Sequence, residues 1–196
     1  MAKKMGEKYQ AIIDAAVRVI AQHGYHQAQV SKIAKEASVA DGTIYLYFDS
    51  KEDILISLFR EKMGLFIETI WKRIDQFERA EDQLRELIYL HLWQLSQNRD
   101  FAVVTQIELR QSNPKVRVGI NEVIKKYLNM IDQIVLLGKQ QQVFRADVEE
   151  AIARKMIFGT LDEAVTSWVM NEREYELVAL VDPLHNLFVH GLKNIK

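Results

Sequence analysis

The sequence predicts an all-α protein. Only two prolines and eight glycines interrupt its 196 residues. Apolar side chains recur at intervals of three and four residues along nearly the whole chain, which is the period of an amphipathic helix. These two observations together predict a succession of helices, without internal repeats or low-complexity segments.

The first three elements are short and closely spaced. A first helix is predicted over residues 8–23, and Gly24 then suits the left-handed position beyond a helix C-terminus. A second helix covers residues 30–37, and the turn after it is Ser38–Val39–Ala40. A third helix is predicted to open at Asp41, whose carboxylate can cap free backbone N–H groups.

A long fourth helix is predicted to open at Ser50, where Asp53 three residues on completes an approximate capping box. Pro114 suits the first position of a later helix, because a proline needs no N–H donor there. The helices after the fourth are expected at 83–96, 101–111, 114–139 and 148–170.

The last helix is predicted to end near Asn194, and its start has two interpretations. In the first, Asp182–Pro183 forms the cap and the first helical position. In the second, Pro183 kinks a helix that begins near Glu176.

The composition excludes several classes of protein. With 48% hydrophobic and 27% charged residues, the chain has the balance of a soluble globular protein. The absence of cysteine excludes disulfides and thiolate chemistry and fits a reducing cytoplasm. We find no signal-peptide stretch and no apolar run long enough to span a bilayer. Since the formal net charge is -1, a basic surface for nucleic acid must be local, with candidates Lys3, Lys4, Lys8, Lys32, Lys35 and Lys51.

The motifs of enzyme chemistry are not found. The sequence lacks a nucleophile motif, a Walker loop, a glycine-rich dinucleotide fingerprint and an HExxH pair. Its five histidines do not have metal-ligand spacing with carboxylates, and His91 is expected to be a hydrogen-bonded core residue. We therefore expect no catalytic residues, no metal and no cofactor.

Residues 29–48 carry the most specific pattern in the chain. They predict two short helices joined by a tight turn, and the second helix carries Thr43, Tyr45 and Tyr47. Such a pair of helices can lay its second member in the major groove of DNA. The pattern therefore indicates a DNA-binding protein.

Residues 9 to about 55 resemble the DNA-binding domain of the TetR family of bacterial transcriptional regulators. The matching residues are Ile12-Ile13-x-Ala15-Ala16, Gly24-Tyr25, Ile33-Ala34-x-x-Ala37, Gly42-Thr43-Ile44-Tyr45-x-Tyr47-Phe48 and Lys51-Glu52-Asp53-Ile54-Leu55. Further segments along the chain resemble a Bacillus-type, acyl-CoA-responsive branch of that family. The resemblance implies a homodimer, an operator with inverted repeats and a small-molecule inducer. It also implies a DNA-binding domain over residues 1–50 and a ligand-binding and dimerisation domain over 51–196, sharing the fourth helix.

The resemblance assigns the DNA contacts to the second and third helices and to the start of the fourth. The expected contacts are Ser31, Lys32, Asp41, Gly42, Thr43, Tyr45, Tyr47 and Lys51. Most would be positioning contacts to phosphate, and base readout would rest on few side chains. Tyr47 has an alternative role in the small core, to which Ile44 and Phe48 are assigned. Ala28-Gln29 and Ser38 depart from the family pattern, which often has a capping threonine and usually a turn glycine at these places.

Aromatic residues are spread over the later helices, and they either fill a bundle core or line a ligand tunnel. The resemblance favours a tunnel for a long-chain acyl-CoA. Arg110 lies in a polar segment at its expected mouth, where it pairs either with coenzyme A phosphates or with Glu108. The predicted ligand contacts are Phe66, Ile70, Leu92, Trp93, Phe101, Val104, Ile107, Leu109, Arg110, Gln111, Asn113, Tyr127 and Phe158.

The last two helices are expected to form the dimer interface. Gly159, Thr160 and Ala164 are small enough for a close helix approach. The apolar stripe of the last helix is Leu177, Leu180, Leu184, Leu187, Phe188 and Leu192. Two such helices from each chain would build a four-helix bundle with twofold symmetry. If the last helix packs only on its own chain, the dimer needs another surface.

The resemblance implies a repressor of fatty-acid degradation genes that long-chain acyl-CoA releases from a palindromic operator. Two alternatives stay open. One is a TetR-type repressor of an efflux pump that responds to lipophilic drugs, and the other is an acyl-CoA carrier that does not bind DNA.

Overall fold

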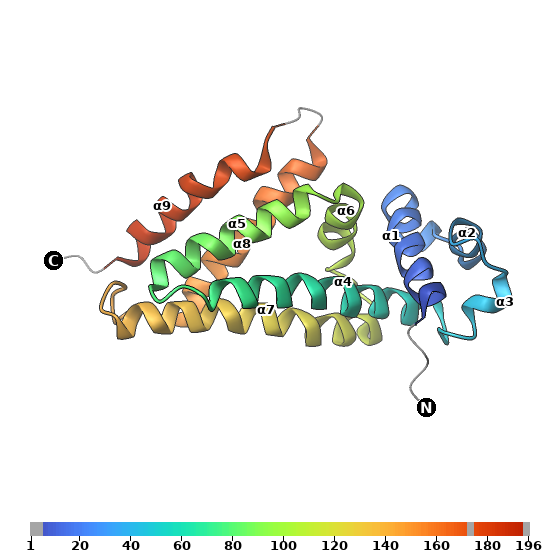
Figure 1. Cartoon of the computed structure of the whole chain (residues 1–196), viewed down its shortest axis with the longest axis horizontal. Coiled ribbons are helices and arrows are strands. Elements are labelled where there is room, and N and C mark those ends of the chain that lie inside the picture. The colour runs from blue at the N-terminus through green and yellow to red at the C-terminus, as the bar shows by residue number, and fades with distance from the viewer. Residues whose placement is uncertain (1–5, 172–174, 194–196) are drawn as a thin grey trace. The chain divides into compact units, whose positions relative to one another are not determined.

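The computed structural model describes residues 6–171 and 175–193. Lys3, Lys4 and the predicted helix end near Asn194 lie outside the described residues. Within those ranges the regular elements are helices, which confirms the all-α class (Figure 1). They are α1 (Glu7–Gln27), α2 (Val30–Glu36), α3 (Asp41–Ile44), α4 (Lys51–Ile74), α5 (Ala80–Ser96), α6 (Arg99–Glu108), α7 (Pro114–Gln140), α8 (Glu150–Met170), a 3-10 turn (Leu177–Leu180) and α9 (Val181–Leu192). None of the helices in this part of the chain is long and apolar enough to cross a bilayer.

The chain divides into two compact units. The N-terminal unit comprises Met1–Gly64 and Asp100–Val123, and the C-terminal unit comprises Leu65–Arg99 and Ile124–Lys196. Helices α4 and α7 each contribute residues to both units. Most of α6 and the start of α7 thus group with α1 to α3, an association that helical periodicity alone does not indicate.

Two residues with positive φ shape the start of the chain. Gly24 has φ 72 and ψ 155, which confirms the expected positive φ, but helical turns resume and α1 extends to Gln27. Ser38, in the turn after α2, has φ 56. A non-glycine residue adopts this left-handed conformation at a cost, which is the physical reason that glycine suits this turn.

The third helix begins at Asp41, as predicted, but the expectation that the Asp41 carboxylate caps it is wrong. Ala40 occupies the N-cap position and no side chain bonds the free N–H groups there, while Asp41 is the first helical residue. Its charge still lies in the first turn, where a negative group is favourable. After Ile44 the backbone continues as tight turns, in which the amide of Tyr47 donates to the carbonyl of Ile44 at 3.0 Å. Tyr45 and Tyr47 therefore follow α3 rather than lie on it.

The predicted caps at the starts of α4 and α7 are confirmed. The Ser50 hydroxyl accepts the Asp53 amide at 3.2 Å, and the Asp53 carboxylate accepts the Asp49 amide at 3.0 Å. Pro114 is the first residue of α7. The side-chain oxygen of Asn113 caps that helix by accepting the Lys115 amide at 2.9 Å.

The last helix begins in a way that neither interpretation described. The 3-10 turn at Leu177–Leu180 leads directly into α9 at Val181, and Pro183 lies in the first turn of α9. A proline is tolerated there because the first N–H groups of a helix have no intrahelical partner.

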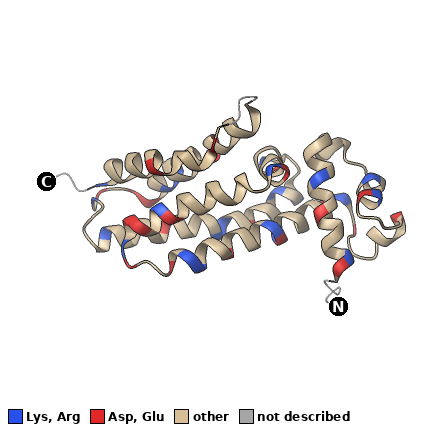
Figure 2. Ribbon diagram, turned by 45° about the horizontal axis from the view of Figure 1, so that its top comes forward, with Lys and Arg blue, Asp and Glu red and all other residues tan. Residues whose placement is uncertain are grey.

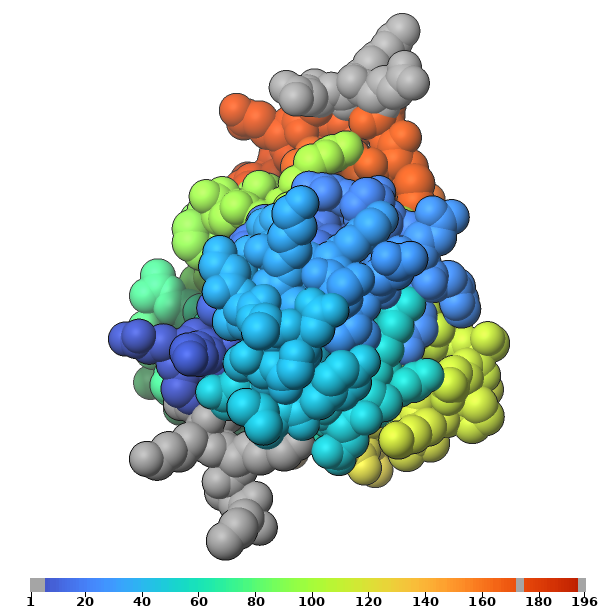
Figure 3. Space-filling view, turned by 90° about the vertical axis from the view of Figure 1, so that its right-hand side faces the viewer, coloured from blue at the N-terminus to red at the C-terminus, as the bar shows by residue number. Residues whose placement is uncertain are grey.

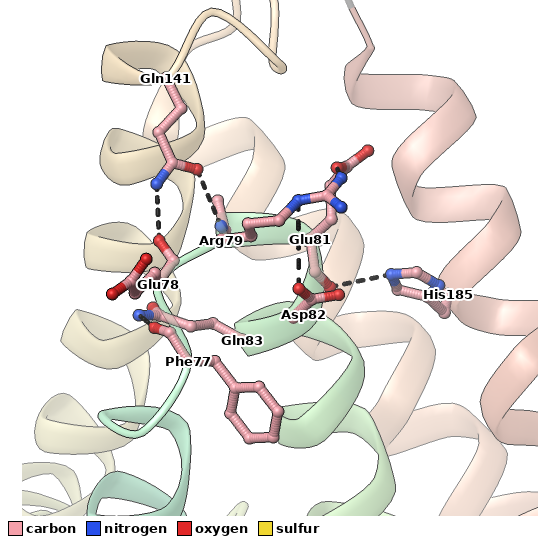
Figure 4. Close-up of polar contacts among 9 residues, drawn as sticks. Phe77, Glu78, Arg79, Glu81, Asp82, Gln83, Gln141 and His185 are labelled. Carbon is pink, nitrogen blue, oxygen red and sulfur yellow. Dashed lines mark hydrogen bonds and ion pairs between the residues drawn. The ribbon is translucent and has the colours of Figure 1, made fainter.

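Within the C-terminal unit, side chains tie the α4–α5 connection to two other helices (Figure 4). Gln141, just beyond α7, accepts the Ala80 amide at 2.9 Å and donates to the Glu78 carbonyl at 2.6 Å. His185 of α9 forms a 3.0 Å hydrogen bond with the carbonyl of Glu81. These bonds hold the start of α5, which explains why this helix begins at Ala80 rather than at residue 83.

Candidate DNA interface and ligand site

The turn that follows α3 presents both buried and exposed side chains. Ile44 and Phe48 are buried, which confirms their assignment to the core. Tyr45 is 57% exposed and Leu46 is 69% exposed, so both project from the surface of the N-terminal unit. Figure 3 shows a face of this unit, with α1 to α3 coloured from blue to cyan. These two side chains are available to an external partner.

Tyr47 is half-buried beside them. Its ring centroid lies 6.2 Å from that of Tyr9 and 6.4 Å from that of Phe48. One side of the ring therefore packs on the small core, while part of the residue remains accessible. Both roles suggested by the sequence are compatible with this position.

Most other predicted DNA contacts lie at the surface. Ser31, Lys32, Asp41 and Gly42 are exposed, and Thr43 is half-buried. A Cβ built on Gly42 would meet nothing within 4 Å, so the packing of the chain does not require glycine there. Figure 2 shows basic residues on both α1 and α2 of this unit.

Lys51, the first residue of α4, has partners inside the N-terminal unit. Its ammonium donates to the carbonyl of His26 at 3.0 Å and lies 4.6 Å from the centre of the Tyr25 ring. Burial lowers the pKa of Lys51, and the charges of Glu52 and Glu108 oppose that shift. The same ammonium that the sequence assigns to phosphate thus also fastens the end of α1 to the start of α4.

A buried carboxylate links α1 to the end of α6. Glu108 is 4% exposed, and its Oε1 accepts the backbone N–H of Tyr25 at 2.9 Å. Its other oxygen accepts a hydrogen bond from the side-chain amide of Gln111. Arg110 donates to the carbonyl of Gln106 at 3.1 Å. The polar segment that the sequence assigned to a tunnel mouth is therefore joined to the residue directly after Gly24.

The predicted ligand contacts fall into both units. In the C-terminal unit, Phe66, Ile70, Leu92 and Tyr127 are buried, Phe158 is half-buried and Trp93 is 40% exposed. In the N-terminal unit, Phe101 and Val104 are buried, Leu109 and Gln111 are half-buried, and Ile107, Arg110 and Asn113 are exposed. The buried members have the surroundings of an apolar ligand wall, and the exposed members lie at the surface of the single chain.

Four rings from four helices form an aromatic cluster inside the C-terminal unit. Phe66 of α4, His91 of α5, Tyr127 of α7 and Phe158 of α8 have neighbouring centroids 5.5 to 6.1 Å apart. The Nδ1 atom of His91 lies 2.8 Å from the hydroxyl of Tyr127, which confirms His91 as a hydrogen-bonded core residue. The sequence had named three of these residues as ligand contacts and had not connected them with His91.

A groove of about 350 Å³ lies between α4 and α7 in the same unit. Its lining residues are Trp71, Ile74, Asp75, Gln83, Met130, Gln133, Ile134, Leu136, Leu137 and Gln140. None of the predicted ligand contacts lines this groove. The aromatic cluster and the groove are therefore distinct features.

The outer faces of α8 and α9 carry apolar and small residues. Ile152 is 56% exposed and Leu187 is 68% exposed. A hollow of about 450 Å³ on α8 is lined by Lys155, Met156, Gly159, Thr160, Glu163, Ala164 and Ser167. Leu177, Phe188 and Leu192 are buried within their own chain. Only part of the predicted apolar stripe therefore faces outward.

Sequence reasoning missed two residues of interest. Leu46 lies between Tyr45 and Tyr47, and its place in the recognition segment was the signal that could have identified it. The role of Glu108 had no local signal, because its partner Tyr25 is 83 residues away. Among the described residues, no group of three or more His, Asp and Glu could hold a metal ion.

Comparison with known proteins places these features among bacterial regulators. Residues 12–58 match the family described as bacterial regulatory proteins, tetR family, and residues 59–191 match the YsiA-like protein, C-terminal region. The fatty acid metabolism regulator protein of Bacillus subtilis (strain 168) is 53% identical over 192 residues, which is 98% of this chain and 99% of that protein.

Two solved structures are similar throughout. The fatty acid degradation regulator FadR from Bacillus halodurans is 55% identical, with a TM-score of 0.89 over 94% of this chain and 100% of that chain. FadR from Bacillus subtilis in complex with stearoyl-CoA is 54% identical, with a TM-score of 0.90 over 94% of this chain and 99% of that chain.

Proposed function

The chain belongs to the TetR family of bacterial regulatory proteins, and from that premise we propose that it is a transcriptional repressor of fatty-acid degradation genes, released from DNA by long-chain acyl-CoA. The observation that carries this proposal is its end-to-end likeness to regulators of fatty acid metabolism, one of which was solved with stearoyl-CoA. The related proteins are regulators and not enzymes.

The DNA-binding half of the proposal uses the surface around α3. Tyr45 and Tyr47 offer hydroxyls to phosphates or base edges, and Thr43 can bond a phosphate or touch a thymine methyl. Gly42 lets the DNA approach the backbone closely. Ser31, Lys32 and Lys51 hold the adjacent phosphates, with Asp41 orienting the start of α3.

We further propose that the repressor is a homodimer formed through α8 and α9. The small residues that line the hollow on α8 permit close approach of a partner helix, and Leu187 on α9 offers exposed apolar surface. Two recognition segments related by a twofold axis would occupy successive major grooves about 34–36 Å apart. A dimer with this symmetry matches a palindromic operator. Because the operator is part of the bacterial chromosome, the protein would act in the cytoplasm.

The acyl chain of the ligand would occupy the apolar interior. Each buried methylene contributes roughly 0.8 kcal/mol, so chain length would set affinity strongly. Arg110, Gln111 and Asn113 are the residues that the sequence assigns to the coenzyme A head group, because a guanidinium binds phosphate bidentately.

The switch would act through helices that contribute to both units. Ligand binding would shift α4 and α7 and thereby change the spacing of the two recognition segments. The hydrogen bond between the Tyr25 N–H and the Glu108 carboxylate connects the end of α6 directly to α1 within the N-terminal unit. To change the population of the DNA-binding conformation from about 99% to about 1%, the ligand must favour the conformation that does not bind DNA by about 5.5 kcal/mol.

In this proposal residues 1–50 bind DNA, residues 51–196 bind ligand and form the dimer, and α4 is shared.

The deciding experiment follows DNA release by fluorescence anisotropy. The purified protein is titrated on its own promoter DNA with palmitoyl-CoA, coenzyme A and free palmitate in parallel. Release by palmitoyl-CoA alone is expected, because only this compound combines the long chain with the head group.

Each other outcome has a distinct meaning. Tight DNA binding without release by any of the three compounds removes the acyl-CoA ligand and favours the efflux-pump repressor. Acyl-CoA binding without DNA binding favours the carrier protein. An unchanged response in Arg110→Ala would remove Arg110 from the head-group role.

A further inference from the structure

The aromatic cluster of the C-terminal unit contains one polar pair. Phe66 and Tyr127 are 3% and 1% exposed, and His91, whose ring neighbours both, is 5% exposed. The ring of Phe66 meets the His91 ring at 83° with a centroid distance of 5.6 Å, which is an edge contact. The imidazole is therefore enclosed by aromatic surface contributed from α4 and α7.

Only one nitrogen of this imidazole is satisfied. Nδ1 lies 2.8 Å from the Tyr127 hydroxyl, whereas Nε2 is buried and has no hydrogen-bond partner among the residues that the structure describes. Burial lowers the pKa of His91 to about 3, so the ring is neutral and carries a single proton. A buried polar atom without a partner is rare in folded proteins and calls for an explanation.

The hydrogen bond to Tyr127 decides which nitrogen carries that proton. If the Tyr127 hydroxyl donates to Nδ1, the imidazole proton lies on Nε2, and the Nε2–H group is the one donor of this pair without an acceptor. In the opposite arrangement Nδ1 donates, and both the hydroxyl hydrogen and the Nε2 lone pair are left unmet. The first arrangement leaves fewer unmet groups, so Nε2–H of His91 is an unused donor inside an apolar interior.

We propose that the Nε2–H group of His91 donates a hydrogen bond to the thioester carbonyl oxygen of a bound long-chain acyl-CoA. The inference rests on the proposed function, and it assigns to that function a buried residue that recognises the thioester itself. In acyl-CoA, the thioester carbonyl oxygen lies at the end of the acyl chain, and it can accept a hydrogen bond but cannot donate one. It therefore complements a donor that has no other partner.

Other candidate acceptors fit this position less well. The face of the Phe66 ring can accept an N–H group only weakly. A free fatty acid would bring an ionised carboxylate into the aromatic cluster, where desolvation strongly disfavours a charge. Since His91 is neutral there, it supplies no compensating positive charge. The site should thus prefer the thioester to the acid.

The test compares two ligands that differ only at the carbonyl. Palmitoyl-CoA has the thioester, and hexadecyl-CoA is the thioether in which a methylene replaces the carbonyl. Binding to the full-length protein is measured by titration calorimetry, and DNA release is measured separately with the same two compounds. We expect the thioester to bind about tenfold more tightly, because only it satisfies the buried donor.

Variants then assign the difference to His91. His91→Leu removes the donor and should bind the two ligands with equal affinity. His91→Gln keeps an N–H donor on the same helix and should retain part of the preference. Gln94→Leu is the matched control: Gln94 is on the same helix, half-buried, and its amide donates to the carbonyl of Phe66 at 3.5 Å. This control should keep the full tenfold preference.

The outcomes separate this proposal from the function on which it rests. If the parent protein binds neither ligand, the acyl-CoA function fails and the role of His91 fails with it. If the parent binds both ligands equally and both release DNA, the function stands and the carbonyl contact is refuted. This comparison within the parent protein decides the matter even if a His91 variant does not fold.

Discussion

At the scale of single residues, Leu46 has an unusual position for an apolar side chain. It is 69% exposed in the segment that follows α3, between two tyrosines assigned to DNA. An apolar side chain in the major groove finds its natural partner in the thymine methyl group, which is the only apolar feature of a base edge there. We therefore expect Leu46 to contribute to base readout.

Replacing thymine with deoxyuracil in the operator tests this expectation, because the two bases differ only by that methyl group. The parent protein should bind the substituted operator about fivefold more weakly, which corresponds to roughly 1 kcal/mol for one methyl contact. Leu46→Ala should bind both operators equally, as measured by fluorescence anisotropy. Leu65→Ala, a similarly exposed leucine in the C-terminal unit, should discriminate as the parent does.

His91 also predicts a dependence of stability on pH. Its pKa is lowered to about 3 by burial, against 6.5 for an exposed histidine. Between these values the unfolded state binds a proton that the folded state does not, so stability is lost as the pH falls from about 6.5 towards 3. This residue alone contributes up to about 1.4 kcal/mol per pH unit in that window.

Urea unfolding of the parent and of His91→Phe at pH 7, 6, 5 and 4 measures that contribution. The loss of unfolding free energy on acidification should be smaller in the variant. His190→Asn, a substitution of an exposed histidine, should follow the parent. Parallel curves for the parent and His91→Phe would contradict the assignment of a neutral, buried imidazole.

At the scale of elements, a single carboxylate joins two helices that are far apart in the sequence. Glu108 ends α6 and accepts the N–H of Tyr25, directly after the bend at Gly24 in α1. The Gln111 side chain holds the other oxygen. Because Glu108 is 4% exposed, water cannot easily replace it as the partner of Tyr25.

Glu108→Ala should therefore lower the unfolding free energy by about 1–3 kcal/mol, since it leaves a buried N–H group without an acceptor. Thermal denaturation monitored by circular dichroism measures the change. The control is Glu68→Ala, which removes an exposed carboxylate paired with Lys72 on the same helix and should cost far less. Equal losses in the two variants would show that the bond to Tyr25 adds no stability.

At the scale of the whole molecule, the proposed dimer depends on surfaces that the chain leaves uncovered. Leu187 on α9 is 68% exposed, and in a twofold interface each substitution at this position occurs twice. A glutamate there would place two carboxylates in an apolar interface, where desolvation opposes them.

Leu187→Glu should therefore be monomeric by light scattering coupled to gel filtration. It should also bind a palindromic operator much more weakly, because one subunit reaches only one half-site. Leu65→Glu is the matched control, since Leu65 is 64% exposed but lies on α4. A dimeric Leu187→Glu protein with full operator affinity would direct the search for the interface to another surface.

The sequence alone determined the fold class and the helix order of this protein. Helical periodicity and capping depend on residues a few positions apart, so the starts at Ser50 and Pro114 were predictable. The recognition segment was identified for the same reason, because its pattern is contained in some twenty consecutive residues. The surface positions of Tyr45 and Lys32 agree with that interpretation of the segment.

The tertiary structure decided which partners these polar side chains have. Asp41 looked like a cap, but it is the first residue of α3, and Ala40 occupies the N-cap position before it. Lys51 looked like a free phosphate contact, but folding brings it to His26 and Tyr25. The pairing of His91 with Tyr127 joins residues 36 positions apart. Such contacts depend on how amphipathic faces pack against one another, and no local pattern in the sequence records that packing.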